Sequence, residues 1–292
     1  MTEPRLHHVP CLDTRGLHRL AWWEWGDAAN PKVLVCVHGL TRQGRDFDVL
    51  AQALSSEYRV VCPDVVGRGE SDRLADPMGY QIPAYVADMV TLLARLNAKT
   101  LHWVGTSMGG LIGMSLASLP GSPIERLVLN DIGPTLRAEG LNHIASYLGA
   151  PIRWPSLDAA ADYLLSISAG FGPHTREQWL ALTKPMLRPN DDAGGEGFKP
   201  HYDPAIGIPF RAITPEMAAA GEAALWKAYD AITCPTLLVR GADSALLDAP
   251  TAQAMTQRGP RARLVEFAGV GHAPTLIAPD QVAAVREFLL AP

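Results

Sequence analysis

Hydrophobic positions along the chain form short apolar runs that alternate with segments of helical spacing. Apolar and β-branched runs, most of them followed by a turn with Gly or Asp, predict strands at residues 32–37, 59–62, 101–104, 126–129, 236–239 and 262–267. Apolar residues at helical spacing predict helices at residues 47–54, 85–96 and 279–290. Strands that alternate with helices in this way predict an α/β fold with a mostly parallel central sheet flanked by helices.

Two segments depart from this alternation. Apolar and polar residues alternate at residues 18–25, which predicts an antiparallel strand at the edge of the sheet. Residues 135–230 contain helical patterns but no convincing strand. We interpret them as a helical lid inserted into a core that consists of residues 1–134 and 231–292.

Composition and charge limit the classes of function. The 292 residues are 48% hydrophobic and 19% charged, as is typical of a globular chain with a large core. The formal net charge is −5 and the basic residues are scattered, so a nucleic-acid groove is not expected. No apolar run is long enough to span a membrane, and the first ten residues lack a signal peptide's apolar stretch, which predicts a soluble cytoplasmic protein. The four cysteines form no CxxC pair, so we expect reduced thiols and no metal site.

The segment most informative for function is LHWVGTSMGGL at residues 101–111. An apolar strand runs directly into the turn GTSMG, and an apolar helix follows. A turn this tight forces Ser107 into strained backbone angles, for which only glycines two positions before and after it leave room. Gly105 and Gly109 meet this need, so the pattern predicts a nucleophile elbow with Ser107 as the nucleophile. The alternative is that Ser107 is an ordinary helix N-cap.

A serine nucleophile needs a base at neutral pH and a carboxylate that orients the base. Among the nine histidines, His272 lies in a turn just after the last predicted strand. From there its imidazole can reach the carboxyl edge of the sheet, so we expect His272 to be the base.

The chain resembles the α/β-hydrolase superfamily over residues 22–290. Besides the elbow and the His272 turn, the similarity rests on the dipeptide HG at residues 38–39 and on PDVVGRGESD at residues 63–72, each of which follows a predicted strand. The resemblance implies the α/β-hydrolase fold. It also implies a mechanism that uses no metal or organic cofactor.

The same resemblance assigns the turn at residues 38–39 to an oxyanion hole. The backbone N–H groups of Leu40 and Met108 would bind the developing negative oxygen there. We expect the His38 side chain itself to serve a structural role, by hydrogen bonding to neighbouring loops.

The usual place for the acid in this family is the loop after the predicted strand at residues 236–239. The carboxylate commonly lies three or four residues past a glycine, but those positions in this chain are Ser244 and Ala245. Asp243 lies one residue earlier than this pattern. A one-residue adjustment of the loop could aim Asp243 at His272, and we predict that Asp243 is the acid.

Asp131 is the main alternative for the acid. It ends the predicted strand at residues 126–129, where some members of the superfamily carry the catalytic carboxylate. Asp248 is a more distant candidate. If Asp131 is not the acid, we expect it to fix its loop by accepting backbone N–H groups.

Three residues are candidates for contact with a substrate. Arg42 lies near the expected oxyanion hole and could bind a substrate carboxylate; alternatively it pairs with a neighbouring residue such as Asp46 to brace the loop. Most aromatic residues of the insertion are expected to pack its helices together, but Trp154 and Trp179 are included as tentative substrate contacts.

We predict a serine hydrolase of the carboxylesterase type that cleaves a small carboxylic ester or thioester through an acyl-enzyme on Ser107. A second enzymatic hypothesis keeps the same residues but cleaves a C–C bond, or opens a lactone, in the breakdown of aromatic compounds. The non-enzymatic hypothesis is a ligand-binding pseudo-hydrolase. A small-molecule ester is the expected partner.

Overall fold

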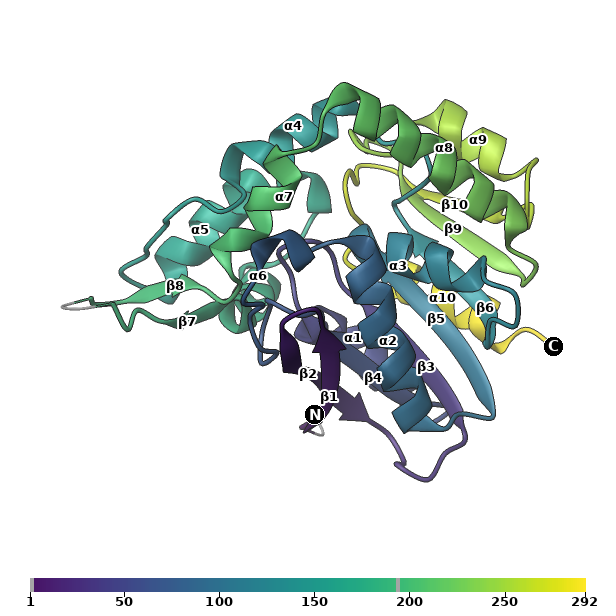
Figure 1. The fold of residues 1–292 in the computed structure, drawn as a ribbon, viewed down its shortest axis with the longest axis horizontal. Coiled ribbons are helices and arrows are strands. Elements are labelled where there is room, and N and C mark those ends of the chain that lie inside the picture. The colour runs from purple at the N-terminus through teal and green to yellow at the C-terminus, as the bar shows by residue number, and fades with distance from the viewer. Residues whose placement is uncertain (1–2, 193–194) are drawn as a thin grey trace.

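One eight-stranded sheet runs through the middle of the molecule in the computed structural model, which describes residues 3–192 and 195–292 (Figure 1). Its strands lie in the order β1-β2-β4-β3-β5-β6-β9-β10. Their bounds are β1 (Arg5–Asp13), β2 (Gly16–Trp25), β3 (Lys32–Val37), β4 (Arg59–Asp64), β5 (Thr100–Thr106), β6 (Ile124–Asn130), β9 (Thr236–Gly241) and β10 (Arg263–Phe267). Neighbouring strands from β4 to β10 are parallel, and β2 is antiparallel to β1 and β4. The predicted mostly parallel sheet is therefore confirmed.

The prediction that residues 18–25 form the edge strand is wrong. β2 lies between β1 and β4, and β1 is the edge. In β1 (RLHHVPCLD) only Val9 and Cys11 are buried, and Pro10 separates them. An edge strand tolerates proline, because an N–H group on its outer side needs no partner in the sheet. The proline and the two histidines of β1 hide the two-residue period that would have predicted a strand.

Helices cover both faces of the sheet. α1 and α10 contact one another over one face. α2, α3 and α8 cover the other face, where α3 contacts both α2 and α8. Outside the insertion the helices are α1 (Asp48–Leu54), α2 (Ile82–Leu96), α3 (Met108–Ala117), α9 (Ala249–Met255) and α10 (Pro279–Leu290), with short 3-10 helices η1 (Gly44–Phe47) and η2 (Pro77–Gly79). Among the described residues, no helix combines the length and apolar character needed to cross a bilayer.

The chain between β6 and β9 forms a group of elements that, apart from its last helix, lies beside the sheet (teal to green in Figure 1). It contains α4 (Ala138–Tyr147), α5 (Leu157–Ile167), η3 (Ala169–Phe171), α6 (Arg176–Thr183), η4 (Lys184–Met186), η5 (Pro204–Ile206), α7 (Gly207–Arg211) and α8 (Pro215–Ala231). It also contains an antiparallel hairpin, β7 (Leu187–Pro189) and β8 (Phe198–Pro200), which the sequence pattern did not predict. Strands of three residues are too short to show a period. α8 packs on α3, so this last helix belongs to the layer that covers the sheet.

Candidate active site

Ser107 lies in the turn between β5 and α3, with φ 52° and ψ −116°. A positive φ is sterically unfavourable for serine, so the surrounding structure must hold the turn. A Cβ on Gly105 would overlap the Gly109 carbonyl, and a Cβ on Gly109 would overlap the Val37 carbonyl. The two glycines thus leave the room that the strained turn needs, and the turn places Ser107 at the carboxyl end of β5.

His272 reaches Ser107 from the loop after β10. Its Nε2 lies 3.0 Å from Ser107 Oγ, at a distance where the hydroxyl donates to the imidazole. Asn130 ties this loop to the sheet, because its Nδ2 donates to the Pro274 carbonyl (2.8 Å) and to the Thr106 hydroxyl (2.9 Å). The structure therefore brings together the serine and the histidine that the sequence singled out.

The carboxylate beside His272 is Asp131, and the prediction that Asp243 lies there is wrong. Asp131 Oδ2 lies 2.7 Å from His272 Nδ1, so the Nδ1–H donates and Nε2 remains able to accept the Ser107 proton. Asp131 is fully buried and directly follows β6, the strand between β5 and β9. The Asp243 side chain is exposed, and its backbone N–H donates to the Val270 carbonyl at 2.9 Å. This bond fixes the loop in a conformation that leaves the Asp243 carboxylate at the surface.

Ser244 occupies one of the positions where the family commonly carries its acid, and its side chain contacts Asp131. Its hydroxyl donates to Asp131 Oδ2 at 2.6 Å, and the Gly241 backbone N–H donates to Asp131 Oδ1 at 2.9 Å. The end of β9 and the loop after it therefore hold both carboxylate oxygens. In the sequence, Ser244 was noted only as a position that lacks a carboxylate. Its hydroxyl was the signal that could have indicated a hydrogen bond to a carboxylate from another strand.

The loop after β3 lies against the turn that contains Ser107. A Cβ on Gly39 would lie 3.7 Å from Ser107 Cβ. Within residues 3–192 and 195–292, the backbone N–H groups of Leu40 and Met108 donate to no protein acceptor. Both groups are thus available for an oxyanion beside Ser107.

His38 is buried and braces this loop. Its Nε2 accepts the Val65 N–H (2.9 Å), so its Nδ1–H donates to the Gly39 carbonyl (2.7 Å). Burial is the main cause that lowers the pKa of His38 to about 3, and the positive charges of Arg68 and Arg42 act in the same direction. The imidazole is therefore neutral and has the structural role that the sequence suggested.

Arg42 is held within the protein by ionic and polar contacts. Its guanidinium donates to both carboxylate oxygens of Asp46, at 2.6 and 2.7 Å, and to the Leu182 carbonyl of the insertion at 3.3 Å. Its side chain is 11% exposed. These contacts favour the loop-bracing interpretation of Arg42 over a role in binding a substrate carboxylate.

Trp154 and Trp179 are buried inside the insertion. The ring of Trp154 lies 5.5 Å from that of Tyr163, and Trp179 stacks on Phe171 at 6.0 Å. In the described part of the chain, no hydrogen bond joins either indole to Ser107, whose hydroxyl contacts His272. The structure therefore assigns them packing contacts between elements of the insertion.

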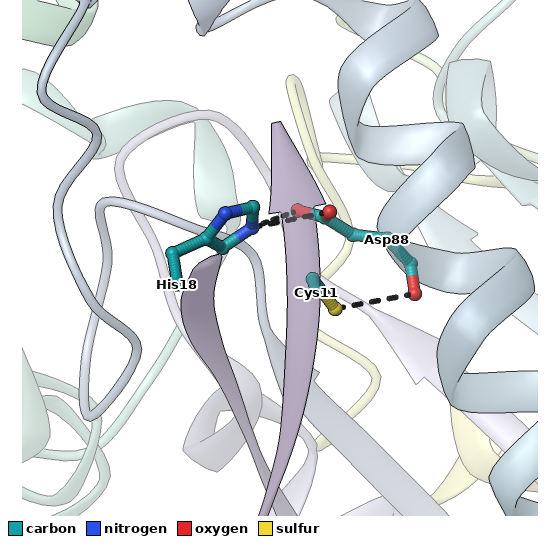
Figure 2. A group of neighbouring side chains, drawn as sticks. All are labelled: Cys11, His18 and Asp88. Carbon is teal, nitrogen blue, oxygen red and sulfur yellow. Dashed lines mark hydrogen bonds and ion pairs between the residues drawn. The ribbon is translucent and has the colours of Figure 1, made fainter. Parts of the chain in front are cut away.

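Cys11, His18 and Asp88, at the β1 edge of the sheet, combine side chains of the types that bind metal ions (Figure 2). Their donor atoms lie within 4.8 Å of one another. His18 Nε2 contacts both Asp88 carboxylate oxygens at 3.1 Å, and the Cys11 thiol points to the Asp88 backbone carbonyl at 3.9 Å. Burial above all, together with the Asp88 charge, raises the pKa of Cys11 to about 12, so the thiol is protonated at neutral pH. These contacts join β1 and β2 to α2.

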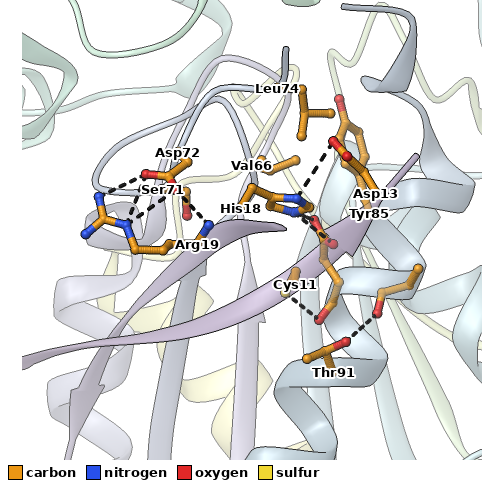
Figure 3. A network of polar contacts seen from close by, with 12 residues as sticks. Cys11, Asp13, His18, Arg19, Val66, Ser71, Asp72, Leu74, Tyr85 and Thr91 are labelled. Atoms are coloured by element: carbon orange, nitrogen blue, oxygen red, sulfur yellow. Dashed lines mark hydrogen bonds and ion pairs between the residues drawn. The ribbon is translucent and has the colours of Figure 1, made fainter. Parts of the chain in front are cut away.

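The same network extends to the surface (Figure 3). His18 Nδ1 lies 3.9 Å from Asp13 Oδ2, and Arg19 Nη2 lies 2.9 Å from Asp72 Oδ1. The Ser71 hydroxyl accepts a backbone N–H of β2 at 2.8 Å. Together these contacts fasten the two antiparallel strands to α2 and to the loop after β4.

Comparison with known proteins matches residues 34–285 to the model of the alpha/beta hydrolase family. The chain is 54% identical over 286 residues to the 3-hydroxybutyrate-oligomer hydrolase of Cupriavidus necator, with 98% of each protein covered. It is 26% identical over 284 residues to the pimeloyl-(acyl-carrier protein) methyl ester esterase of Photobacterium profundum, with 92% of this chain and 98% of that protein covered. The crystal structure of an alpha/beta hydrolase from Novosphingobium aromaticivorans is similar with a TM-score of 0.85 and 36% identity, over 99% of both chains.

Proposed function

Because this chain belongs to the alpha/beta hydrolase family and is an enzyme that acts on ester bonds, we propose that it cleaves carboxylic esters through an acyl-enzyme on Ser107. The observation that carries the proposal is a pair of hydrogen bonds through His272. One joins Ser107 Oγ to His272 Nε2 (3.0 Å), and the other joins His272 Nδ1 to Asp131 Oδ2 (2.7 Å). A nucleophile, a base and an orienting carboxylate lie within hydrogen-bond distance of one another, in the chain order Ser, Asp, His.

In the first half of the reaction, Ser107 Oγ attacks the ester carbonyl carbon while His272 Nε2 takes the hydroxyl proton. The carbonyl oxygen becomes an oxyanion, which the N–H groups of Leu40 and Met108 bind. Asp131 stabilises the imidazolium and holds its orientation. His272 then gives its proton to the leaving alkoxide, the C–O bond breaks, and an ester of Ser107 remains.

In the second half, a water molecule takes the place of the alcohol. His272 removes one proton from the water, whose oxygen attacks the acyl carbon and re-forms the oxyanion. When the bond to Ser107 Oγ breaks, His272 returns the proton to the serine and the carboxylic acid leaves. One water is consumed for each ester bond.

We propose that residues 135–230, excluding α8, act as a lid over this site. Two hydrogen bonds support the assignment, because they join the insertion to loops around Ser107. The Gly170 carbonyl accepts the Gly271 N–H at 2.5 Å, next to His272. The His201 carbonyl accepts the Gly69 N–H at 2.9 Å, in the loop after β4. A cover here would exclude water from the reacting groups.

We propose short oligomers of 3-hydroxybutyrate as the substrate class. The support is the 54% identity, over 98% of both proteins, to a relative named as a hydrolase of such oligomers. In an oligomer of this kind, the acyl group that Ser107 would receive and the leaving alcohol are both 3-hydroxybutyrate units. Each turnover would give two shorter hydroxy acids.

The test is to incubate the purified protein with the dimer and the trimer of 3-hydroxybutyrate and to quantify the released monomer by chromatography. Parallel reactions contain p-nitrophenyl butyrate, a butyryl thioester, a lactone and an aromatic ring-fission product, and Ser107→Ala is the control. We expect release of monomer that depends on Ser107. Turnover of only the ring-fission product or the lactone would support the second enzymatic hypothesis, and binding without turnover of any compound would support the pseudo-hydrolase.

Ser244→Ala tests whether the loop after β9 holds the acid in place. We expect kcat for p-nitrophenyl butyrate to fall about 10- to 100-fold with KM nearly unchanged, because a hydrogen bond to a charged group contributes about 1.5–3 kcal/mol. The exposed Ser146 of α4, whose hydroxyl donates to the His143 carbonyl, provides the matched control Ser146→Ala. Equal kcat values for the two variants would show that Ser244 does not support Asp131.

A further inference from the structure

Arg68 lies in the loop after β4 and is 1% exposed. Its Nε donates to the Leu40 carbonyl at 2.8 Å, and its Nη1 donates to the Val66 carbonyl (2.7 Å) and the Tyr85 hydroxyl (3.0 Å). Its Nη2 lies 3.7 Å from Met108 Sδ. The guanidinium therefore contacts both residues whose backbone N–H groups form the proposed oxyanion hole.

No carboxylate neutralises this charge at close range. Among the residues that the structure describes, no Asp or Glu oxygen lies within 4.0 Å of an Arg68 guanidinium nitrogen. A guanidinium is a positive charge, and burial of a charge without a counter-charge is costly. The rings of Tyr80 and Tyr85, with centroids 5.7 and 5.1 Å from Arg68 Cζ, offset part of this cost. Within the described part of the chain, Arg68 is thus a buried cation with no ionic partner at close range.

The insertion covers this cation. Arg68 pairs with Tyr202 in an isolated antiparallel bridge, and the Asp203 N–H donates to the Gly67 carbonyl at 2.7 Å. These contacts keep water away from the guanidinium. A charge in such a dry environment acts over short distances with little screening.

We propose that Arg68 is a positioning residue for the oxyanion hole, and that the oxyanion of the transition state is the ionic partner which the free enzyme lacks. The proposal rests on the proposed function, because it requires an oxyanion formed by attack of Ser107. The N–H and the carbonyl of Leu40 lie on either side of the same Cα. Because Arg68 holds the carbonyl, it limits the directions in which the N–H can point. A preorganised charge stabilises the oxyanion without any rearrangement when it forms.

Two variants separate the effect of the charge from that of the geometry. Arg68→Met removes the charge but keeps an apolar side chain of similar length. Arg68→Lys keeps the charge but cannot donate in a fixed fork to Leu40, Val66 and Tyr85 together. The matched control is Arg19→Met, which removes the same charge from an exposed side chain of β2 that pairs with Asp72. Thermal unfolding of each variant shows whether it is folded.

The measurements are kcat and KM for p-nitrophenyl butyrate and the inhibition constant of an alkyl trifluoromethyl ketone. The ketone adds to Ser107: a bond forms between Oγ and the carbonyl carbon, the serine proton passes to His272, and the carbonyl oxygen becomes an oxyanion. For Arg68→Met we expect kcat to fall about 10- to 100-fold, the inhibition constant to rise by a similar factor, and KM to change less than about 3-fold. Arg68→Lys is expected to lower kcat and to raise the inhibition constant, each by a smaller factor than Arg68→Met.

A purely structural role would not link kcat to the affinity for an anionic adduct. If folded Arg68→Met and Arg68→Lys keep kcat and the inhibition constant within twofold of Arg19→Met, the proposal for Arg68 is overturned while the proposed function stands. If Arg68→Met fails to fold, the result for Arg68→Lys decides by the same criterion. If the wild-type protein forms no adduct with the ketone, the proposed function fails, and the proposal for Arg68 fails with it.

Discussion

Ser107→Ala is expected to lower kcat for ester hydrolysis about 10⁴- to 10⁶-fold, the range for loss of a triad nucleophile. In the proposed mechanism the hydroxyl supplies the atom that forms the acyl-enzyme, so its loss leaves His272 without a group to activate. Folding should be nearly unchanged, because Ser107 Oγ has no described partner other than His272. The measurement is turnover of p-nitrophenyl butyrate, together with a thermal unfolding curve for each variant.

Ser118→Ala is the matched control for this variant. Ser118 directly follows α3, the helix that begins after Ser107, and its hydroxyl donates to the Ser115 carbonyl. We expect this control to keep its activity within twofold. If Ser107→Ala kept more than about a tenth of the wild-type activity, catalysis would not depend on a serine nucleophile at this position.

Asp131→Asn is expected to lower kcat about 10⁴-fold, whereas Asp243→Asn should change it less than twofold. An amide at position 131 can no longer fix the His272 tautomer or stabilise its cation, although it has almost the same shape. Asp243 is exposed and lies in the loop after β9, so Asp243→Asn removes only one surface charge.

The two aspartate variants control for one another, because each replaces one carboxylate by an amide near the same histidine. Circular dichroism and thermal unfolding distinguish lost orientation of His272 from lost structure. A large loss of kcat in Asp243→Asn, with Asp131→Asn active, would identify Asp243 as the acid and contradict the proposed role of Asp131.

The pairing of Ser107 with His272 could be predicted from sequence, because the place of each residue depends on local constraints. The turn at Ser107 needs glycine at two fixed positions, and the structure shows that a Cβ at Gly105 or Gly109 would overlap a backbone carbonyl. His272 follows the last strand of the sheet, so its place along the chain already brings it to the correct edge. The alternation of strands and helices predicted the sheet for the same reason, since it is a repeating local pattern.

The acid could not be assigned from sequence, because two parallel strands, β6 and β9, end at the same edge of the sheet and each is followed by an aspartate. Which carboxylate meets His272 depends on how the loop after β9 turns. In the structure the Asp243 N–H donates to the Val270 carbonyl, and the Ser244 hydroxyl donates to the Asp131 carboxylate. Both hydrogen bonds join residues that are far apart in the sequence. No local pattern records such contacts.

β1 escaped prediction for a different reason. Its neighbour β2 buries residues from both faces, but β1 buries only Val9 and Cys11 and carries a proline between them. An edge strand of this kind is stabilised by its pairing with β2 and has almost no hydrophobic pattern of its own. The short hairpin of β7 and β8 was missed for the same lack of periodicity.

The most direct test of Ser107 as the nucleophile is to label the protein with a fluorophosphonate and to locate the adduct by peptide mass spectrometry. We expect one adduct, on Ser107, with loss of ester hydrolysis in proportion to labelling and no labelling of Ser107→Ala. An adduct on another residue, or hydrolysis that continues after Ser107 is fully labelled, would contradict it.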